Sequence, residues 1–263
     1  MIVADLHVHT TRSDGSLPPD AVSDAARAAD LRAVAVTDHD RLPPLDAPVV
    51  ERDGVTVIAG IELRVTAGDQ QLDLLGYGVD PTPALRAETE RLQRDRIERA
   101  RKIIDCVEDR LGVNLDLDVH PGVGRPHIAQ AVADSHGHYT VQDAFDQLIG
   151  TDQPCYVARD LPTVERGREL LDDAAALVGL AHPLRYDDPD AALAHAGSLD
   201  AIEREYPYER AVDRTPVDDA IEAHDLLATG GSDAHGETLG IAGLGRATSE
   251  RFCTALDAAL STV

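Results

Sequence analysis

Seven short apolar runs rich in β-branched residues recur along the chain, and most of them end in a polar or charged cluster. They lie within IVADLHVH, RAVAVTDHD, VTVIAGIEL, QLDLLGYGV, ALVGLAHP, LDAIERE and LLATGGSDAH. Helical patterns separate several of them, as in PPDAVSDAARAADL, where proline stands near the start and alanines form an apolar face. This alternation predicts an α/β fold with a parallel sheet, and seven strands with polar carboxyl ends favour a barrel.

One segment breaks this alternation. From about residue 81 to 160 the chain carries a long charged helical pattern, PALRAETERLQRDRIERARKIIDCVEDRLG, followed by two shorter helical patterns and no convincing strand. Glu and Arg at helical spacings are typical of a solvated helix face. We therefore expect residues 1–80 and 161–263 to form the barrel, and residues 81–160 to form a helical insertion over its mouth.

The charge balance is strongly acidic. The formal net charge is -24, and of the 24 Lys and Arg residues only Lys102 is a lysine. An acidic surface with arginine as the main cation indicates a halophilic protein. Near 1 M salt the Debye length is about 3 Å, so this charge does not exclude a nucleotide substrate. It argues against binding to long duplex nucleic acid, which needs a basic stripe that the sequence lacks.

Cysteine usage and the N-terminus indicate a cytoplasmic protein. Cys106, Cys155 and Cys253 are far apart and form no CxxC pair, so we expect neither a disulfide framework nor a thiolate zinc site. The opening MIVADLHVH has no basic n-region and no uninterrupted apolar h-region, and no stretch holds 18 consecutive apolar residues. We expect a soluble protein without a membrane partner, and the sequence leaves its oligomeric state open.

Side chains that commonly bind metals gather where the expected strands end. His7 and His9 are two residues apart, so both point to the same face of the first strand. Taken alone, such a pair is more often a hydrogen-bonded pair in the core. The same residue types recur near other strand ends, as Asp14, His39, Glu62, His182, Asp233 and His235. Because buried charged groups cost several kcal/mol unless they are paired or metal-bound, this set predicts a site for several divalent ions. Imidazole and carboxylate without thiolate suit Zn²⁺, Mn²⁺ or Fe²⁺.

The segments DLHVHTTRSDG, AVTDHD, GIEL, GRPHIA, AHPLRYD and GSDAH, in this order, resemble the polymerase and histidinol phosphatase (PHP) superfamily of metal-dependent phosphoesterases. The resemblance spans nearly the whole chain and implies a distorted (β/α)7 barrel of the PHP type. The RPH of the insertion and the LLGYGVD segment look most like the branch that contains nucleotide 3',5'-bisphosphate phosphatases and 5'-to-3' exoribonucleases.

Carried over by position, the resemblance implies a centre of three divalent ions. The implied ligands are His7, His9, Glu62 and Asp233 for the first ion, Glu62 and His182 for the second, and Asp14, His39 and His235 for the third. Glu62, Asp233 and His235 are also the residues we expect to act in catalysis.

Two positions depart from the family pattern. The second ion usually takes another histidine, in the place where this chain has Asp73. Aspartate there is a harder ligand that favours Mn²⁺ or Fe²⁺ over Zn²⁺, or it leaves the second site weak, or it is an ordinary acid of the barrel rim. Relatives also often carry histidine at the position of Glu209, whose role the sequence does not indicate.

Clustered divalent ions can activate a water, neutralise phosphoryl oxygens and stabilise the transition state, so no side-chain nucleophile is needed. The chain has no GxSxG motif and no cysteine in a reactive context, which makes covalent catalysis the poorer reading. A metal-bound water, or a His or Asp of the rim, would protonate the leaving oxygen.

Arginine is the natural partner for a second phosphate, because its planar fork binds two oxygens at once. Arg125 and His127 in GVGRPHIA and Arg185 in AHPLRYD are the candidates for substrate binding. A helix starting near Pro126 and running through residues 127–136 would also favour an anion at its N-terminus. His127 has the alternative role of an N-terminal cap, and Arg185 that of an ion-pair partner for Asp187 or Asp188.

Together these features predict a metal-dependent hydrolase of phosphoric esters. Its expected substrate is a small phosphomonoester, either a nucleoside 3',5'-bisphosphate or the 5' end of a short RNA. One alternative is a phosphatase of histidinol phosphate or another metabolite. The other is a non-catalytic metal-binding module, as in some polymerase-associated PHP domains; the nearly complete ligand set argues against it.

Overall fold

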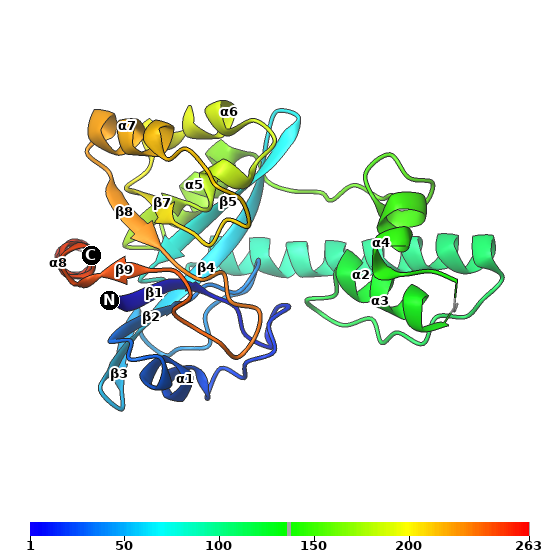
Figure 1. The fold of residues 1–263 in the computed structure, drawn as a ribbon, viewed down its shortest axis with the longest axis horizontal. Coiled ribbons are helices and arrows are strands. Elements are labelled where there is room, and N and C mark those ends of the chain that lie inside the picture. Colours follow the sequence, from blue (N-terminus) through cyan, green and yellow to red (C-terminus); the bar gives the residue numbers. More distant parts are fainter. Residues whose placement is uncertain (136–137, 263) are drawn as a thin grey trace. The chain divides into compact units, whose positions relative to one another are not determined.

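The computed structural model describes residues 1–135 and 138–262 (Figure 1). The strands are β1 (Ile2–Val8), β2 (Ala33–Val36), β3 (Val49–Arg52), β4 (Val55–Ala67), β5 (Gln70–Tyr77), β6 (Leu177–Leu180), β7 (Ala201–Glu205), β8 (Leu227–Gly230) and β9 (Leu244–Gly245). The α-helices are α1 (Val22–Ala28), α2 (Pro83–Leu111), α3 (Arg125–Ser135), α4 (Val141–Ala144), α5 (Val164–Asp172), α6 (Pro189–Leu193), α7 (Thr215–His224) and α8 (Arg246–Leu260). Shorter helical turns are η1 (Phe145–Ile149), η2 (Pro183–Arg185) and η3 (Ala196–Ser198).

The chain divides into two compact units. The first, called the barrel unit below, comprises Met1–Ala87 and Leu161–Val263, and the second, called the helical unit, comprises Glu88–Asp160. The expected position of the insertion over the barrel mouth stays a prediction. In the described part of the chain, no helix is both long enough and apolar enough to cross a membrane.

All strands of the described residues belong to one sheet, with the order β8-β7-β6-β5-β4-β2-β1-β9 and β3 paired to β4. Each of the seven expected strands is present. Two more, β3 and β9, were not expected: β3 is only partly buried, and β9 is two residues long, so neither gives a strong apolar run.

The expectation of a uniformly parallel sheet is wrong. Strand pairs β1–β2, β2–β4, β6–β7 and β7–β8 are parallel, whereas β4–β5 and β5–β6 are antiparallel. Only Gly68 and Asp69 separate β4 from β5, and a connection that short makes a hairpin, since a parallel crossover needs a dozen or more residues. Glu62 therefore lies inside a long strand and not at its end.

The barrel nearly closes between the end of β8 and β1. The amide of His9 donates to the carbonyl of Ala234 at 3.0 Å, and Val8 and Ala234 form an isolated bridge. A Cβ at Gly231 would lie 2.4 Å from the Cβ of His7, so this close approach requires glycine. The closure brings residues 7–9 beside residues 231–235.

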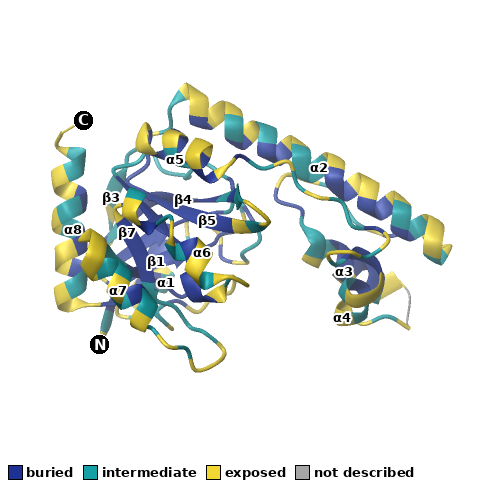
Figure 2. Ribbon diagram, turned by 90° about the horizontal axis from the view of Figure 1, so that it is seen from above, coloured by how far each residue is buried: buried dark blue, intermediate teal, exposed yellow. Residues whose placement is uncertain are grey.

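Helices cover the barrel through apolar side chains, while the strands between them are buried (Figure 2). Val22 and Ala26 of α1 join Val34 and Val57 in one core cluster. In a second cluster, Phe252 of α8 meets Tyr77 edge-to-face with ring centroids 5.2 Å apart. Such an aromatic pair contributes about 1 kcal/mol beyond its buried area.

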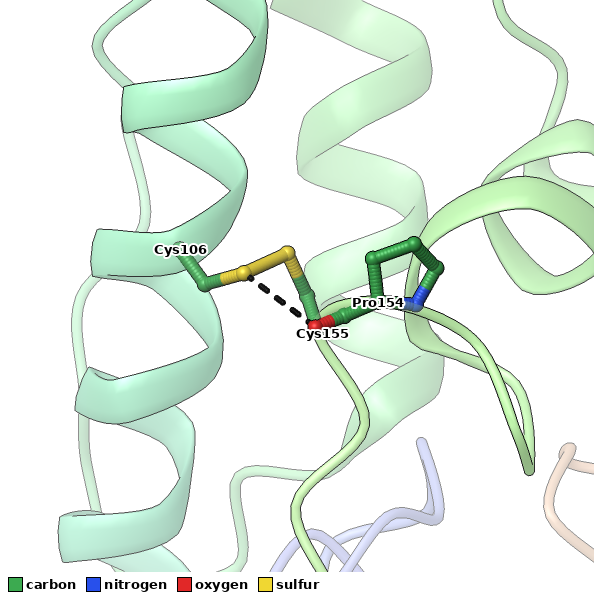
Figure 3. Close-up of a disulfide and its surroundings, with 3 residues drawn as sticks. All are labelled: Cys106, Pro154 and Cys155. Carbon is green, nitrogen blue, oxygen red and sulfur yellow. Dashed lines mark hydrogen bonds between the residues drawn. A yellow bond between two sulfur atoms is a disulfide. The ribbon is translucent and has the colours of Figure 1, made fainter.

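The helical unit has its own core, formed by α2, α3, α4 and η1. α3 begins at Arg125, so Pro126 lies in its first turn as expected, and residue 136, the expected helix end, lies outside the described residues. Cys106 on α2 and Cys155 form a disulfide with their Cα atoms 5.6 Å apart (Figure 3). The expectation that the cysteines form no disulfide is wrong for this pair, because the fold of the helical unit joins Cys106 to a turn that follows η1, 49 residues away, and the two share no spacing motif.

Candidate metal centre

A fully buried carboxylate, that of Glu62, lies among four imidazoles. Its Oε1 atom is 3.2 Å from Nε2 of His182 and 3.3 Å from Nε2 of His7. Its Oε2 atom is 2.6 Å from Nδ1 of His39 and 3.5 Å from Nε2 of His9. The mid-strand position of Glu62 thus lets one side chain reach imidazoles at the ends of β1, β2 and β6.

Two further carboxylates complete the cluster. Oδ1 of Asp233 lies 3.0 Å from Nε2 of His9 and 3.6 Å from Nδ1 of His235. Asp14 places Oδ1 3.3 Å from Nε2 of His235 and Oδ2 3.7 Å from Nε2 of His39.

The ligand atoms form four groups whose members all lie within 4.8 Å of one another. The groups are His9, Asp14, His39 and His235; His7, His9 and Asp233; His7, Glu62 and His182; and His39, Glu62 and Asp73. The structure therefore brings all nine predicted ligands together, and their binding of ions stays a prediction.

Several buried ligand atoms fit a divalent cation better than they fit their protein neighbours. Nε2 of His7 and both ring nitrogens of His9 form no acceptable hydrogen bond within residues 1–135 and 138–262. Leaving a buried polar atom without a partner costs about 1–3 kcal/mol. Cations coordinated by these nitrogens and by Asp233 would remove that cost.

The charges of the centre favour cations. Burial alone would raise the pKa of Glu62, but His39 and His7 hold it well below its usual range. Burial likewise opposes the charge of His7, yet Glu203, Glu62 and Asp233 raise the pKa of that imidazole well above its ordinary value. Glu62 is therefore an anion at neutral pH. The imidazoles that carry protons beside it would release them when cations bind.

The backbone is strained at the same place. His182 and Asp233 have φ values of 28° and 50°, in the left-handed region that non-glycine residues rarely adopt. Strain of this kind clusters at functional sites, where the surrounding structure holds it. Here it turns both side chains toward Glu62 and His9, directly after β6 and β8.

Sequence reasoning missed Glu203 of β7, which is fully buried. Its Oε1 atom lies 3.1 Å from Nδ1 of His7, and its Oε2 atom accepts the backbone N–H of His182 at 2.8 Å. A carboxylate bound to the far nitrogen of an imidazole fixes the tautomer and the ring orientation of a metal ligand. The available signal was a glutamate next to Ile202 inside an expected strand, where an uncompensated charge is costly.

Asp5 is a second buried carboxylate without an assigned role in the sequence analysis. It accepts hydrogen bonds from the amide of Ser232 at 2.9 Å and from the amide of Gly240 at 2.8 Å. These bonds hold the backbone beside Asp233. The repeated i, i+2 spacing of acids and histidines in DLHVH gave no indication of this partner.

Among the candidate substrate contacts, Arg185 lies at the metal centre. Its Nη1 atom is 3.2 Å from Oδ2 of Asp233 and 3.2 Å from the hydroxyl of Tyr206. In the part of the chain that the structure describes, it forms no ion pair with Asp187 or Asp188. The alternative reading of Arg185 thus loses support.

Arg125 and His127 belong to the helical unit. Nδ1 of His127 accepts the amide of Gly124 at 3.0 Å, which matches the alternative role of a cap. The guanidinium carbon of Arg125 lies 5.6 Å from the ring centroid of Tyr156 and 5.9 Å from that of Phe145.

Three arginines of the helical unit, Arg99, Arg125 and Arg159, lie close enough to interact electrostatically. Arg99 is buried and donates from Nε to the carbonyl of Val157 at 2.7 Å. Burial first, and then the charges of Arg125 and Arg159, lower the pKa of Arg99 to about 10. An anion bound among these guanidinium groups would relieve their repulsion.

Comparison with known proteins agrees with this chemistry. Residues 5–212 match the model of the PHP domain. A 3',5'-nucleoside bisphosphate phosphatase of Chromobacterium violaceum is 31% identical over 195 residues, covering 70% of this chain and 67% of the relative. The 5'-3' exoribonuclease Rnm of Escherichia coli K12 is 27% identical over 258 residues, covering 89% and 85%. A phosphoribosyl 1,2-cyclic phosphate 1,2-diphosphodiesterase of Eggerthella lenta is 29% identical over 260 residues, covering 90% and 95%.

Two solved structures share the fold. A protein from Bifidobacterium adolescentis, assigned as a metal-dependent phosphoesterase, superimposes with a TM-score of 0.78 at 24% identity, covering 97% of this chain and 96% of the other. A Chromobacterium violaceum amidohydrolase with bound sulfate gives 0.74 at 24% identity, covering 96% of each chain. The expected barrel of the PHP type is confirmed.

Proposed function

Because the chain belongs to the PHP domain family and is a hydrolase of phosphoesters, we propose that it hydrolyses a phosphomonoester bond of a small nucleotide, above all of a nucleoside 3',5'-bisphosphate. The observation that carries this proposal is the gathering of four imidazoles and Asp233 around the buried carboxylate of Glu62. The identity to the bisphosphate phosphatase supports the substrate class.

Two ligand groups are suited to divalent ions: His7, His9 and Asp233, and His9, Asp14, His39 and His235. Glu62 lies beside the first group, 3.3 Å from Nε2 of His7. Ions bound there would supply an activated water and neutralise the phosphoryl oxygens. Imidazole and carboxylate donors favour Mn²⁺, Fe²⁺ or Zn²⁺. Glu203 contributes by fixing the ring of His7 so that Nε2 faces Glu62.

We assign catalytic roles to Glu62, Asp233 and His235, as the sequence predicts. Glu62 is fully buried, whereas the side chain of His235 is 40% exposed, so His235 lies on the open side of the cluster. With Asp14, whose Oδ1 atom lies 3.3 Å from its Nε2 atom, this imidazole would hold an ion on the open side of the cluster, and that ion would supply positive charge to stabilise the leaving oxygen. Asp233 would orient the same ring from the Nδ1 side.

The phosphate that is not cleaved needs its own partners. Arg185, with its side chain 58% exposed beside Asp233, and Arg125, with its neighbouring arginines, are the proposed contacts. His127 is a weaker candidate because its Nδ1 atom already accepts the amide of Gly124. A guanidinium fork binds two phosphate oxygens, which would distinguish bisphosphates from monophosphates.

A short RNA bearing a 5' phosphate is the second candidate substrate. The exoribonuclease relative, which aligns over 89% of this chain, favours it. The 5'-terminal nucleotide of such an RNA carries a 5' and a 3' phosphate on one ribose, as the small bisphosphate does, but its 3' phosphate is a diester to the next nucleotide. One set of phosphate contacts would serve both substrates.

The test begins with metal analysis of the protein purified in about 1 M salt, where screening offsets its acidic charge. Phosphate release from adenosine 3',5'-bisphosphate and from histidinol phosphate, and release of phosphate or nucleoside monophosphate from a 5'-phosphorylated RNA trimer, are then compared, each with added Mn²⁺. We expect turnover of the bisphosphate at the highest kcat/KM. Turnover of histidinol phosphate alone would overturn the nucleotide proposal. Metal loss in His7→Ala without loss of activity would indicate a scaffold instead of a catalytic centre.

A further inference from the structure

An arginine and an aspartate face each other beside the metal centre. Arg64 on β4 and Asp73 on β5 are directly opposite in the antiparallel register. Nε of Arg64 donates to Oδ1 of Asp73, and Nη2 donates to Oδ2, both at 2.7 Å. Because the hairpin fixes this register and the Asp73 side chain is only 3% exposed, the pair is built into the fold.

Asp73 stands where the family pattern places a ligand of the second ion. Its Oδ2 atom is 3.8 Å from Nε2 of His182, and that nitrogen is 3.2 Å from Oε1 of Glu62. Both oxygens of Asp73, however, already accept from one guanidinium. That guanidinium stays charged at every accessible pH, so it repels a cation at the same carboxylate.

Asp233 shows the contrast. Its Oδ2 atom accepts from Arg185 and from the hydroxyl of Tyr206, but its Oδ1 atom faces His9 and His7. One oxygen of Asp233 is therefore directed at imidazoles, which become neutral when a metal binds. Neither oxygen of Asp73 is free of the guanidinium, although Oδ2 also lies 3.8 Å from Nε2 of His182, so Asp73 is a poor ligand for a divalent ion on this side of Glu62.

Arg64 has donors left for another ligand. Two of its five N–H groups bond Asp73, and its side chain is 33% exposed. Among the described residues, its Nη1 atom donates to no protein acceptor. The charge of Asp73 first, and then those of Glu62 and Asp40, raise the pKa of the guanidinium above its usual range, against the opposing effect of burial.

We propose that the Arg64 guanidinium, anchored by Asp73, takes the place of a divalent ion on this side of Glu62 and binds a phosphoryl oxygen of the substrate directly. The centre then holds two ions and one guanidinium, in contrast to the three ions implied by the family resemblance. The phosphoryl group is still neutralised by positive charge, but the Arg64 guanidinium supplies part of that charge in place of an ion. This inference rests on the proposed phosphoesterase function and specifies how that site meets its substrate.

The decisive experiment counts Mn²⁺ ions per chain after equilibrium dialysis in high salt. We expect about two ions in the unmodified protein and an unchanged count in Asp73→Asn, because a carboxylate bound to arginine is not an ion ligand. A fall of one ion in Asp73→Asn would overturn the proposal, since Asp73 would then be a metal ligand.

A second variant tests the guanidinium itself. Arg64→Ala frees Asp73, so we expect a gain of about one ion, which Arg64→Ala combined with Asp73→Asn should abolish. Arg52→Ala on the neighbouring β3 removes an arginine outside the site and should leave the count unchanged. Three ions bound by both the unmodified protein and Arg64→Ala would contradict the proposal.

Phosphate binding gives a readout that needs no turnover. With Mn²⁺ present, inorganic phosphate should bind Arg64→Ala roughly tenfold to a hundredfold more weakly than the Arg52→Ala control. Equal phosphate binding by the two variants would overturn the role of Arg64. Metal counts and phosphate affinity do not depend on which ester the enzyme cleaves, so these results separate failure of this inference from failure of the proposed substrate.

Discussion

The barrel unit and the helical unit bury side chains of opposite charge. In the barrel unit the fully buried Glu62 lies among imidazoles, and Asp233 and Asp14 add negative charge. In the helical unit the buried Arg99 lies near Arg125 and Arg159, and its pKa falls to about 10. The first arrangement attracts cations and the second attracts anions. In a chain with a net charge of -24, we therefore propose that cleavage depends on the barrel unit, and that the arginines of the helical unit, together with Arg185, contribute to recognition of the phosphorylated ligand.

Replacing Glu62 should have the largest effect, because it removes the buried negative charge on which the metal centre of the barrel unit depends. Glu62→Gln keeps the size of the side chain but removes the charge that the four imidazoles face. We expect loss of bound Mn²⁺ and a fall in kcat of about 10³-fold or more, because several kcal/mol of transition-state stabilisation depend on the ions. Metal analysis and phosphate release measure both effects, with Glu51→Gln on β3 as the control. Retained activity would show that Glu62 is not part of the centre.

Glu203→Gln should have the next largest effect. The amide can still bond Nδ1 of His7, but it no longer favours the tautomer that presents Nε2 to a metal. We expect the affinity for Mn²⁺ to fall about 10- to 100-fold, with little change in kcat once Mn²⁺ saturates the protein. Titration of activity against Mn²⁺ measures the shift. A lower kcat at saturation would indicate that Glu203 acts beyond positioning His7.

Arg125→Ala tests the helical half of the comparison. If this arginine binds the phosphate that is not cleaved, KM for the bisphosphate should rise about 10- to 100-fold, as for loss of a charge-assisted hydrogen bond. A simple aryl phosphate has no second phosphate, so its KM should not change. Arg101→Ala, an exposed position on α2, is the matched control. Equal losses for both substrates would place Arg125 outside substrate recognition.

The sequence predicted that the proposed barrel ligands lie close together, because strand periodicity carries that information. His7 and His9 share a face, and His39, His182 and Asp233 follow apolar runs that end at one rim. Imidazoles and carboxylates that recur near the ends of several strands therefore indicate one shared site. Periodicity did not indicate that Glu62 lies inside a long hairpin strand, since VTVIAGIEL reads equally well as a short parallel strand.

The sequence did not predict contacts that depend on how distant segments of the chain pair or pack. Arg64 and Asp73 are opposite only because β4 and β5 form a hairpin with this register, and Glu203 meets His7 across 196 residues. The same holds for Cys106 and Cys155, which helix packing brings together. Tertiary structure sets all three pairs, and no local pattern in the sequence specifies them.

The disulfide gives the smallest expected effect on catalysis and tests whether the two units are independent. Cys106→Ser removes a cross-link that closes a loop of 49 residues in the helical unit, which should lower the stability of that unit by up to about 4 kcal/mol. The barrel ligands lie in the other unit, so the Mn²⁺ count should not change.

Thermal unfolding with and without a reductant measures the effect of the disulfide, and Cys253→Ser, which removes a cysteine outside it, is the matched control. If reduction lowers kcat/KM for the bisphosphate but not for an aryl phosphate, the cross-link supports the arginines that recognise the second phosphate. If reduction also releases Mn²⁺, the metal centre depends on the helical unit, and the proposal that the two units act independently is wrong.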